Sequence, residues 1–174
     1  MSPLGPIRLG AYGDRLCLCG WPDELHPGRV ERRLRTMLKA GFHDCGEITG
    51  TADTGIPEVL LETARQLDEY FNGHRRAFDI PLLPVGSDFQ KRVWQQLLHI
   101  PYGTTVSYGE LAAAIGSPDS VRAVANANGA NAIPIIIPCH RVIGSDGSLT
   151  GYGGGMAVKR FLLELERTDS KATE

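Results

Sequence analysis

The residues best suited to chemistry in this sequence are Cys139 and His140, which directly follow the apolar run 135–137. Pro134 and Pro138 lie at the two ends of the run. Proline fixes φ and favours extended geometry in the residue before it, so we expect both preceding isoleucines to be extended. The run should then form a short, buried, strand-like segment that holds the thiol in a rigid position away from water.

A buried cysteine has two interpretations. Free cysteine is among the most buried residue types, so Cys139 could be an inert part of the core. His140 and Arg141 directly after it favour a nucleophile, because such side chains rarely continue a core strand. The thiolate is the reactive form, and a thiol with a pKa of about 8.5 needs a base at neutral pH. His140 is the obvious base, and because neighbouring side chains on extended backbone point apart, we expect a water molecule to bridge it to Cys139.

A longer pattern surrounds this pair. The motif Pro-Cys-His-Arg-Val at residues 138–142, preceded by Asn131, resembles the signature of the O6-alkylguanine-DNA alkyltransferases, also called methylated-DNA–protein-cysteine methyltransferases. The resemblance runs from about Gly86 to Glu166. Its other motifs, in chain order, are Phe89-Gln90, Val93-Trp94, Ile100-Pro101-Tyr102-Gly103, Ser107-Tyr108, Arg122-Ala123-Val124 and Gly151-Tyr152.

The resemblance implies DNA repair by direct reversal, in which the alkyl group of O6-alkylguanine, with O4-alkylthymine as a further candidate, moves irreversibly to Cys139. The product is a thioether, which has no carbonyl for water to attack, so each molecule would act once. The resemblance also implies a relay from Cys139 through water and His140 to Glu166. Read alone, Glu166 would be a solvated carboxylate near a helix end. No cofactor and no metal are implied.

Further site residues follow from the resemblance alone. Tyr108 matches a phenol that donates to the departing guanine, and Asn131 matches a hinge that ties the active-site turn to a recognition helix. Arg122 would enter the base stack where the flipped nucleotide was, although a lone arginine is by default a surface ion-pair partner. The other expected DNA contacts are Ser117, Ala123, Asn128 and Ser145. The expected walls of the alkylguanine pocket are Pro134, Val142, Tyr152 and Gly153.

Two other function classes stay open on the residues. A cysteine hydrolase built from Cys139, His140 and Glu166 would turn over esters or amides. A helix-turn-helix binding module would leave Cys139 incidental and bind DNA equally well without the thiol. Transfer that stops at one equivalent distinguishes the alkyltransferase from both.

Composition limits the number of domains and the cellular compartment that we expect. The chain has 174 residues, 42% of them hydrophobic and 22% charged, enough for one large or two small domains. It has no apolar run of membrane-spanning length and no secretory signal pattern, and its four cysteines suggest reduced thiols, so we expect a cytoplasmic protein. The Cys17-x-Cys19 spacing is shorter than the Cys-x2–4-Cys pairs of structural zinc sites, which argues against zinc.

Charge predicts how the protein meets DNA. The formal net charge is -2, and residues 86–167 hold seven Lys or Arg against six Asp or Glu. Binding should therefore depend on few phosphate contacts, with moderate affinity and a shallow dependence on salt. The expected partner is double-stranded DNA carrying O6-alkylguanine, bound by a monomer.

Residues 1–84 predict an N-terminal α/β domain with a small antiparallel sheet, and the resemblance implies ribonuclease-H-like topology for it. Strands are expected at 7–11 and 16–21, joined by a hairpin, with helices at 27–40 and 57–71. Residues 78–83 could form a third strand, and Pro81 favours an edge position or an early end for it. Relatives have a further strand before the Ser2–Gly5 turn, so this sheet should be one strand short or completed differently.

Residues 85–167 predict a mostly helical domain, which the resemblance makes winged-helix-like. Helices are expected at 88–98 with Asp88 as a cap, from a Ser107 capping box to 115, at 119–128 with Ser117 as a cap, and at 156–166. The second and third form either a helix-turn-helix or an ordinary hairpin. Small side chains on the third suit close approach to a minor groove, as the resemblance implies. Residues 168–174 read as a disordered polar tail.

Overall fold

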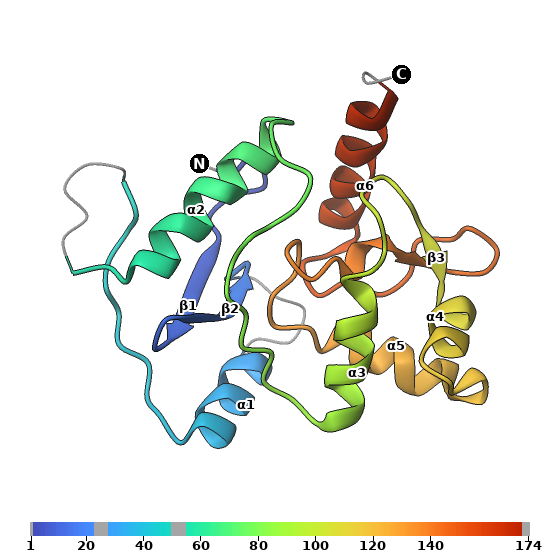
Figure 1. Cartoon of the computed structure of the whole chain (residues 1–174), viewed down its shortest axis with the longest axis horizontal. Coiled ribbons are helices and arrows are strands. Elements are labelled where there is room, and N and C mark those ends of the chain that lie inside the picture. The colour runs from blue at the N-terminus through green and yellow to red at the C-terminus, as the bar shows by residue number, and fades with distance from the viewer. Residues whose placement is uncertain (1, 23–27, 50–54, 172–174) are drawn as a thin grey trace.

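The computed structural model describes residues 2–22, 28–49 and 55–171, with only the backbone described for the last three of these. A β-hairpin with helices α1 and α2 forms one part, and helices α3 to α6 form the other (Figure 1). The elements are β1 (Arg8–Tyr12), β2 (Arg15–Gly20), α1 (Arg29–Leu38), α2 (Glu58–Phe71), α3 (Asp88–Leu97), β3 (Val106–Ser107), α4 (Tyr108–Ala114), η1 (Pro118–Ser120), α5 (Val121–Gly129), η2 (Cys139–Arg141), β4 (Val142–Ile143) and α6 (Met156–Lys171).

The N-terminal sheet is an antiparallel pair, as expected. β1 and β2 are joined by a turn in which Gly13 has a φ of 62°, a left-handed value that glycine adopts without steric cost. A register shift between Gly10 and Ala11 marks a bulge in β1. Helix α2 packs across both strands, so the hairpin gains the second layer that an isolated hairpin lacks.

The expected third strand is wrong. Residues 78–83 contribute only a single parallel bridge between Leu82 and Leu16. The Leu16 N–H donates to the Pro81 carbonyl (2.8 Å), and the Leu83 N–H donates back to Leu16 (2.8 Å). Pro81 has no N–H of its own to extend the ladder, so pairing ends after this exchange.

Side-chain caps begin α3 and α4, but not η1 or α5. Ser87, rather than the expected Asp88, caps α3 and forms a capping box with Gln90. The predicted box of Ser107 and Glu110 is confirmed at the start of α4. Ser117 makes no side-chain cap; η1, a short 3₁₀ turn, begins there with Pro118 at its first position, and α5 follows.

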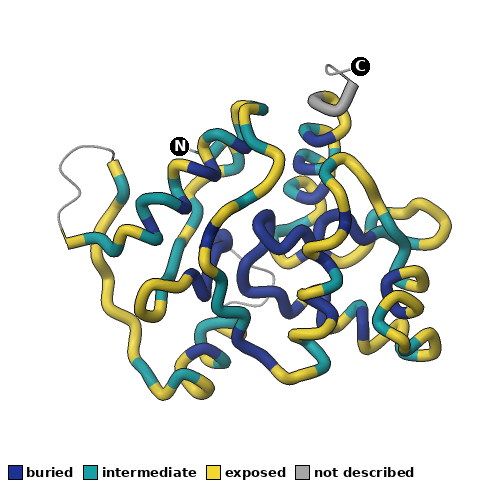
Figure 2. Tube along the Cα trace, in the orientation of Figure 1, coloured by how far each residue is buried: buried dark blue, intermediate teal, exposed yellow. Residues whose placement is uncertain are grey.

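The core is centred on the chain between α5 and β4. Every residue from 130 to 142 is buried, and this segment forms the densest buried part of the tube in Figure 2. Strand β2 contacts this buried segment, because the Cys19 N–H donates to the Ala132 carbonyl (2.8 Å). Cys17 and Leu18 lie in a separate apolar cluster from Leu16 and Cys19. Helix α6 extends to Lys171, so it includes the first residues of the expected polar tail; residues 172–174 lie outside the described part.

Candidate active site

The segment before Cys139 is a turn, and the expected strand is wrong. Ile135 has a φ of 73°, which is a rare and strained value for a β-branched residue. The Ile137 N–H donates back to the Ile133 carbonyl (2.9 Å), closing a compact loop. Local bonds thus replace strand pairing, and the isoleucine side chains fill the core from a turn.

Asn131 holds this turn closed. Its Nδ2 donates to the Ile137 carbonyl (2.8 Å), and its Oδ1 accepts from the Ile133 N–H (2.9 Å). The Asn131 N–H also donates to the carbonyl of Asn128 (3.3 Å), in the last turn of α5. Through its backbone and its side chain, one buried residue therefore links the end of α5 to the turn that leads to Cys139.

Cys139 begins the 3₁₀ turn η2. Its N–H donates to the Ile137 carbonyl (2.8 Å), and its carbonyl accepts from Asn128 Nδ2 (3.3 Å) and from the Val142 N–H. The backbone here is not extended as expected. With three residues per turn, the side chains of Cys139 and His140 leave the helix axis about 120° apart rather than on opposite sides.

His140 and Glu166 meet in the core. His140 Nε2 lies 2.8 Å from Glu166 Oε1, and both side chains are fully buried. His140 Nδ1 is also buried and finds no hydrogen-bond partner among the described residues. Burial lowers the pKa of His140, while Glu166 opposes this effect in part. The imidazole is therefore neutral at neutral pH, which a base requires.

Glu166 is enclosed by donors from three segments of the chain: α2, the loop after α3, and η2. Arg141 binds both carboxylate oxygens through Nε and Nη2 (2.9 Å each), and its Nη1 donates to the Ile100 carbonyl (2.7 Å). The Tyr70 hydroxyl donates to Oε1 (2.8 Å) and the Gly103 N–H to Oε2 (3.0 Å). Burial alone would raise the pKa of Glu166, but its bonds to His140 and Arg141 outweigh burial and lower the pKa to about 2. The carboxylate is thus ionised and held in place.

The Cys139 thiol is protonated at rest. Burial raises the pKa of Cys139 to about 11, although the Asn131 side chain and the charge of Lys159 act in the opposite direction. Cys19, the neighbouring buried thiol, has its pKa raised to about 12 by burial and by the proximity of Cys139. Cys139 is therefore the easier of the two to ionise, and still needs a base.

Tyr108 and Lys159 converge on one carbonyl. The Tyr108 hydroxyl donates to the Thr150 carbonyl (3.1 Å), which also accepts from Lys159 Nζ (2.9 Å). Lys159 is fully buried and donates to the Val142 carbonyl as well (2.6 Å), so it joins β4 to the start of the glycine-rich loop. For Tyr108 to donate to a guanine, its hydroxyl has to leave Thr150.

The other expected residues divide by exposure. Arg122 and Ala123 are exposed on the first turn of α5, and Ser145 is exposed in the turn after β4. Ser117 is half-buried and Asn128 is buried. Of the expected pocket walls, Pro134, Val142 and Tyr152 are buried, whereas Gly153 is exposed. The Tyr152 ring lies against Trp21 of the N-terminal part, with centroids 6.3 Å apart.

Sequence reasoning missed four groups at the site: Tyr70, the Gly103 N–H, Arg141 as the partner of Glu166, and Lys159. Arg141 lies inside the motif, next to two residues expected to be buried, and a buried arginine predicts a buried carboxylate partner. Tyr70 is 96 residues from Glu166 and gave no local signal.

Two negative findings apply to the described ranges. No helix within 2–22, 28–49 and 55–171 has the length and apolar character needed to cross a membrane. Over the same ranges, no three His, Cys, Asp or Glu side chains gather as a metal site.

Comparisons with known proteins agree with one another. Residues 1–84 match the ribonuclease-like domain and residues 88–168 the DNA-binding domain of 6-O-methylguanine DNA methyltransferase. A methylated-DNA–protein-cysteine methyltransferase of Mycobacterium tuberculosis is 46% identical over 98% of this chain and 92% of its own length. A constitutive enzyme of that name from Bacillus subtilis is 52% identical over 64% of this chain and 68% of its own length.

A solved structure supports the same relationship. The crystal structure of Mycobacterium tuberculosis OGT in complex with DNA superposes with a TM-score of 0.76 at 42% identity, covering 97% of this chain and 90% of that one. Both halves of the sequence, the arrangement of its elements and the Cys139 motif therefore point the same way. The chain belongs to the family of methylated-DNA–protein-cysteine methyltransferases.

Proposed function

We propose that this protein repairs O6-alkylguanine in DNA by moving the alkyl group to the sulfur of Cys139. The observation that carries the proposal is a buried thiol, Cys139, followed directly in the chain by a buried histidine. Nε2 of that histidine, His140, lies 2.8 Å from Glu166 Oε1. A thiol with a raised pKa beside an oriented, neutral imidazole suits a nucleophile that is ionised only when it reacts.

The protonation of His140 follows from its partner. Glu166 is ionised and can only accept, so Nε2 carries the hydrogen and Nδ1 carries the lone pair. We propose that Nδ1 takes the Cys139 proton through one water molecule. Glu166 then stabilises the imidazolium, and Arg141, Tyr70 and the Gly103 N–H keep Glu166 in position.

The transfer itself is a displacement at a saturated carbon. The Cys139 thiolate attacks the alkyl carbon, an S–C bond forms, and the bond from that carbon to guanine O6 breaks. The electron pair leaves with the guanine, whose developing charge Tyr108 stabilises by donating its hydroxyl. The departing guanine takes one proton from water, and the imidazolium of His140 returns the former thiol proton to water, so the charges balance. No carbonyl remains on the sulfur, so water cannot regenerate the thiol.

DNA recognition is proposed to use α4, η1 and α5 as a helix-turn-helix within a winged-helix-like domain of residues 85–167. The exposed Arg122 and Ala123 at the start of α5 support this assignment. Small side chains let α5 approach a minor groove closely, and Arg122 fills the stack after the damaged base has flipped out. The substrate is double-stranded DNA and the protein acts as a monomer, with residues 1–84 forming the N-terminal domain.

The experiment that tests the proposal is a stoichiometry titration. A duplex with labelled O6-methylguanine is mixed with increasing amounts of protein, and label on the protein is counted at completion. A plateau near one methyl group per protein supports transfer. Continued release of product without protein labelling would instead indicate a hydrolase, and absence of any transfer would leave only a binding protein.

A further inference from the structure

The largest concentration of positive charge in the described chain lies on α1, far from the reactive cysteine in sequence. Residues 29–39 hold five Lys or Arg and one Glu, in a protein whose formal net charge is -2. Helix α5, the proposed recognition helix, carries Arg122 as its single charged residue. The helix that enters the groove is thus nearly neutral, and the charge that suits a polyanion lies elsewhere.

Two arginines of α1, Arg29 and Arg32, are available for a ligand. Arg29 and Arg32 are exposed and form no ion pair with any described residue, and Glu31, the acid of the helix, is already paired with Arg8. Arg29, Arg32 and Arg33 line a shallow groove of about 290 Å³ together with Thr36 and Met37. A guanidinium offers a fork of N–H donors that matches two oxygens of one phosphate.

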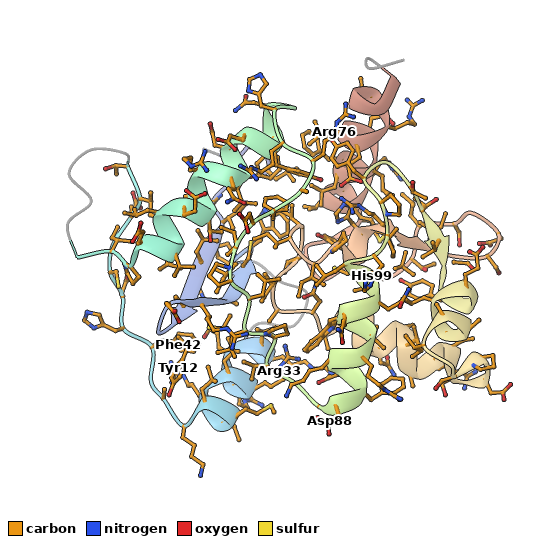
Figure 3. The ribbon with its side chains drawn as sticks, in the orientation of Figure 1. Tyr12, Arg33, Phe42, Arg76, Asp88 and His99 are labelled. Carbon is orange, nitrogen blue, oxygen red and sulfur yellow. The ribbon has the colours of Figure 1, made fainter. Side chains whose placement is uncertain are left out.

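This groove adjoins the end of α5. Arg33 Nη2 donates to the carbonyl of Ala130, the residue that ends α5 (2.7 Å), and its guanidinium lies 5.4 Å from the ring centroid of Trp94 in α3. Figure 3 shows Arg33 between α1 and α3, and Figure 1 shows α1, α3 and α5 along the same edge of the molecule. A strand of DNA leaving the C-terminal end of α5 along this edge would meet the α1 groove.

We propose that the α1 face, defined by Arg29, Arg32 and Thr36, binds backbone phosphates of the same duplex that α5 engages. The inference rests on the proposed function and extends it to the N-terminal domain. An acidic protein would also complement the charge, but DNA is the polyanion that α5 already holds beside this helix. The N-terminal domain therefore adds affinity that does not depend on sequence or on damage.

The test is the salt dependence of binding to an undamaged duplex of about 20 base pairs, followed by fluorescence anisotropy. Each phosphate contact contributes about 0.9 to the slope of log K against log salt, so Arg29→Gln with Arg32→Gln should lower the slope by about 1.8 and each single variant by about half of that. Arg29→Lys with Arg32→Lys keeps the charge and should keep the slope. Arg76→Gln removes one charge at the opposite end of the molecule, beside α6 in Figure 3, and should leave the slope unchanged.

Alkyl transfer from a free O6-alkylguanine base separates this proposal from the one it rests on. That reaction needs no backbone contact, so all variants should label at the wild-type rate; failure of the wild-type protein itself would instead count against the proposed function. Equal slopes for wild type and the Gln double variant would overturn the α1 proposal. A second outcome would also overturn it. Light scattering would show that the wild-type protein is a dimer and the Gln double variant a monomer, with the same salt slope for both, because the α1 face would then bind a second copy of the chain.

Discussion

The Tyr70 hydroxyl donates to Glu166 Oε1 at 2.8 Å, although the two residues are 96 positions apart. Tyr70 comes from α2 in the N-terminal part, and Glu166 comes from α6 in the C-terminal part. The same oxygen lies 2.8 Å from His140 Nε2. The N-terminal half of the chain thus helps to hold the carboxylate that contacts His140.

Replacing Tyr70 by Phe should weaken the fold and alter the pH profile of transfer. A buried carboxylate loses a donor, which costs about 1.5–3 kcal/mol in the free energy of unfolding. With one donor fewer, Glu166 attracts the imidazolium more strongly, so the pKa of His140 rises and the rising limb of the transfer rate moves to higher pH. Chemical denaturation and single-turnover rates measure the two effects.

The control for Tyr70→Phe is Thr63→Val, which removes another buried hydroxyl from the same helix. Thr63 donates only to the Val59 carbonyl (2.6 Å), within α2. Its substitution should leave the pH profile unchanged. A Tyr70→Phe protein with wild-type stability and a wild-type profile would show that the hydroxyl does not support Glu166.

Glu166 should account for part of the loss of stability in acid. Its pKa lies near 2 in the folded protein against an ordinary value of 4.5, so its contribution is complete above pH 4.5 and is lost as pH falls towards 2. The loss should be roughly 3 kcal/mol, at about 1.4 kcal/mol per unit. In Glu166→Gln this part of the pH dependence should disappear, as measured by denaturant unfolding between pH 2 and 5.

The comparison protein for that measurement is Glu164→Gln, which changes an exposed carboxylate on the same helix. It should keep the steep loss of stability seen in the wild-type protein. An equally steep loss in Glu166→Gln would mean that another group causes it.

His140→Gln should slow alkyl transfer by about 10²–10⁴-fold at neutral pH, the usual contribution of a general base. Because the pKa of Cys139 lies near 11, only roughly one thiol in 10⁴ is ionised at pH 7 without help. The difference from wild type should narrow as pH approaches 10, where hydroxide ionises the thiol directly. His99→Gln, at an exposed histidine, serves as the control, and a constant difference at all pH values would argue against a base.

Asn131→Ala should destabilise the turn before Cys139. It leaves the Ile133 N–H buried without a partner, at about 1–3 kcal/mol, and leaves the Ile137 carbonyl with the Cys139 N–H as its remaining donor. The free energy of unfolding should fall by at least that amount in Asn131→Ala. It should fall by less than about 0.5 kcal/mol in Asn126→Ala, at a half-buried site on α5. Wild-type stability in Asn131→Ala would show that the turn holds itself closed.

Sequence patterns predicted the elements whose signals are local. The hairpin, the helices and the capping box of Ser107 depend on neighbours within a few residues, and the structure contains them. His140 and Glu166 were expected to meet on the strength of a family resemblance, and they do. Apolar periodicity alone would have left Glu166 as a solvated carboxylate.

The rest depends on long-range contacts. The apolar run before Cys139 was expected to be a strand because prolines flank it, but the side chain of Asn131 supplies the bonds that close a turn and Ile135 adopts a left-handed φ. The buried charges of Arg141 and Lys159 have partners on distant elements. A pattern of neighbouring residues does not identify which distant residue will be the partner of a buried charge.

Intact-mass analysis followed by peptide mapping tests most directly whether Cys139 keeps the alkyl group. After reaction with a duplex containing O6-methylguanine, the protein should be about 14 Da heavier, as a methyl thioether requires, with the added mass on the peptide that contains Cys139 and none on Cys17, Cys19 or Cys45. Added mass at one of those other cysteines, or an unmodified protein beside a fully repaired duplex, would contradict transfer to Cys139.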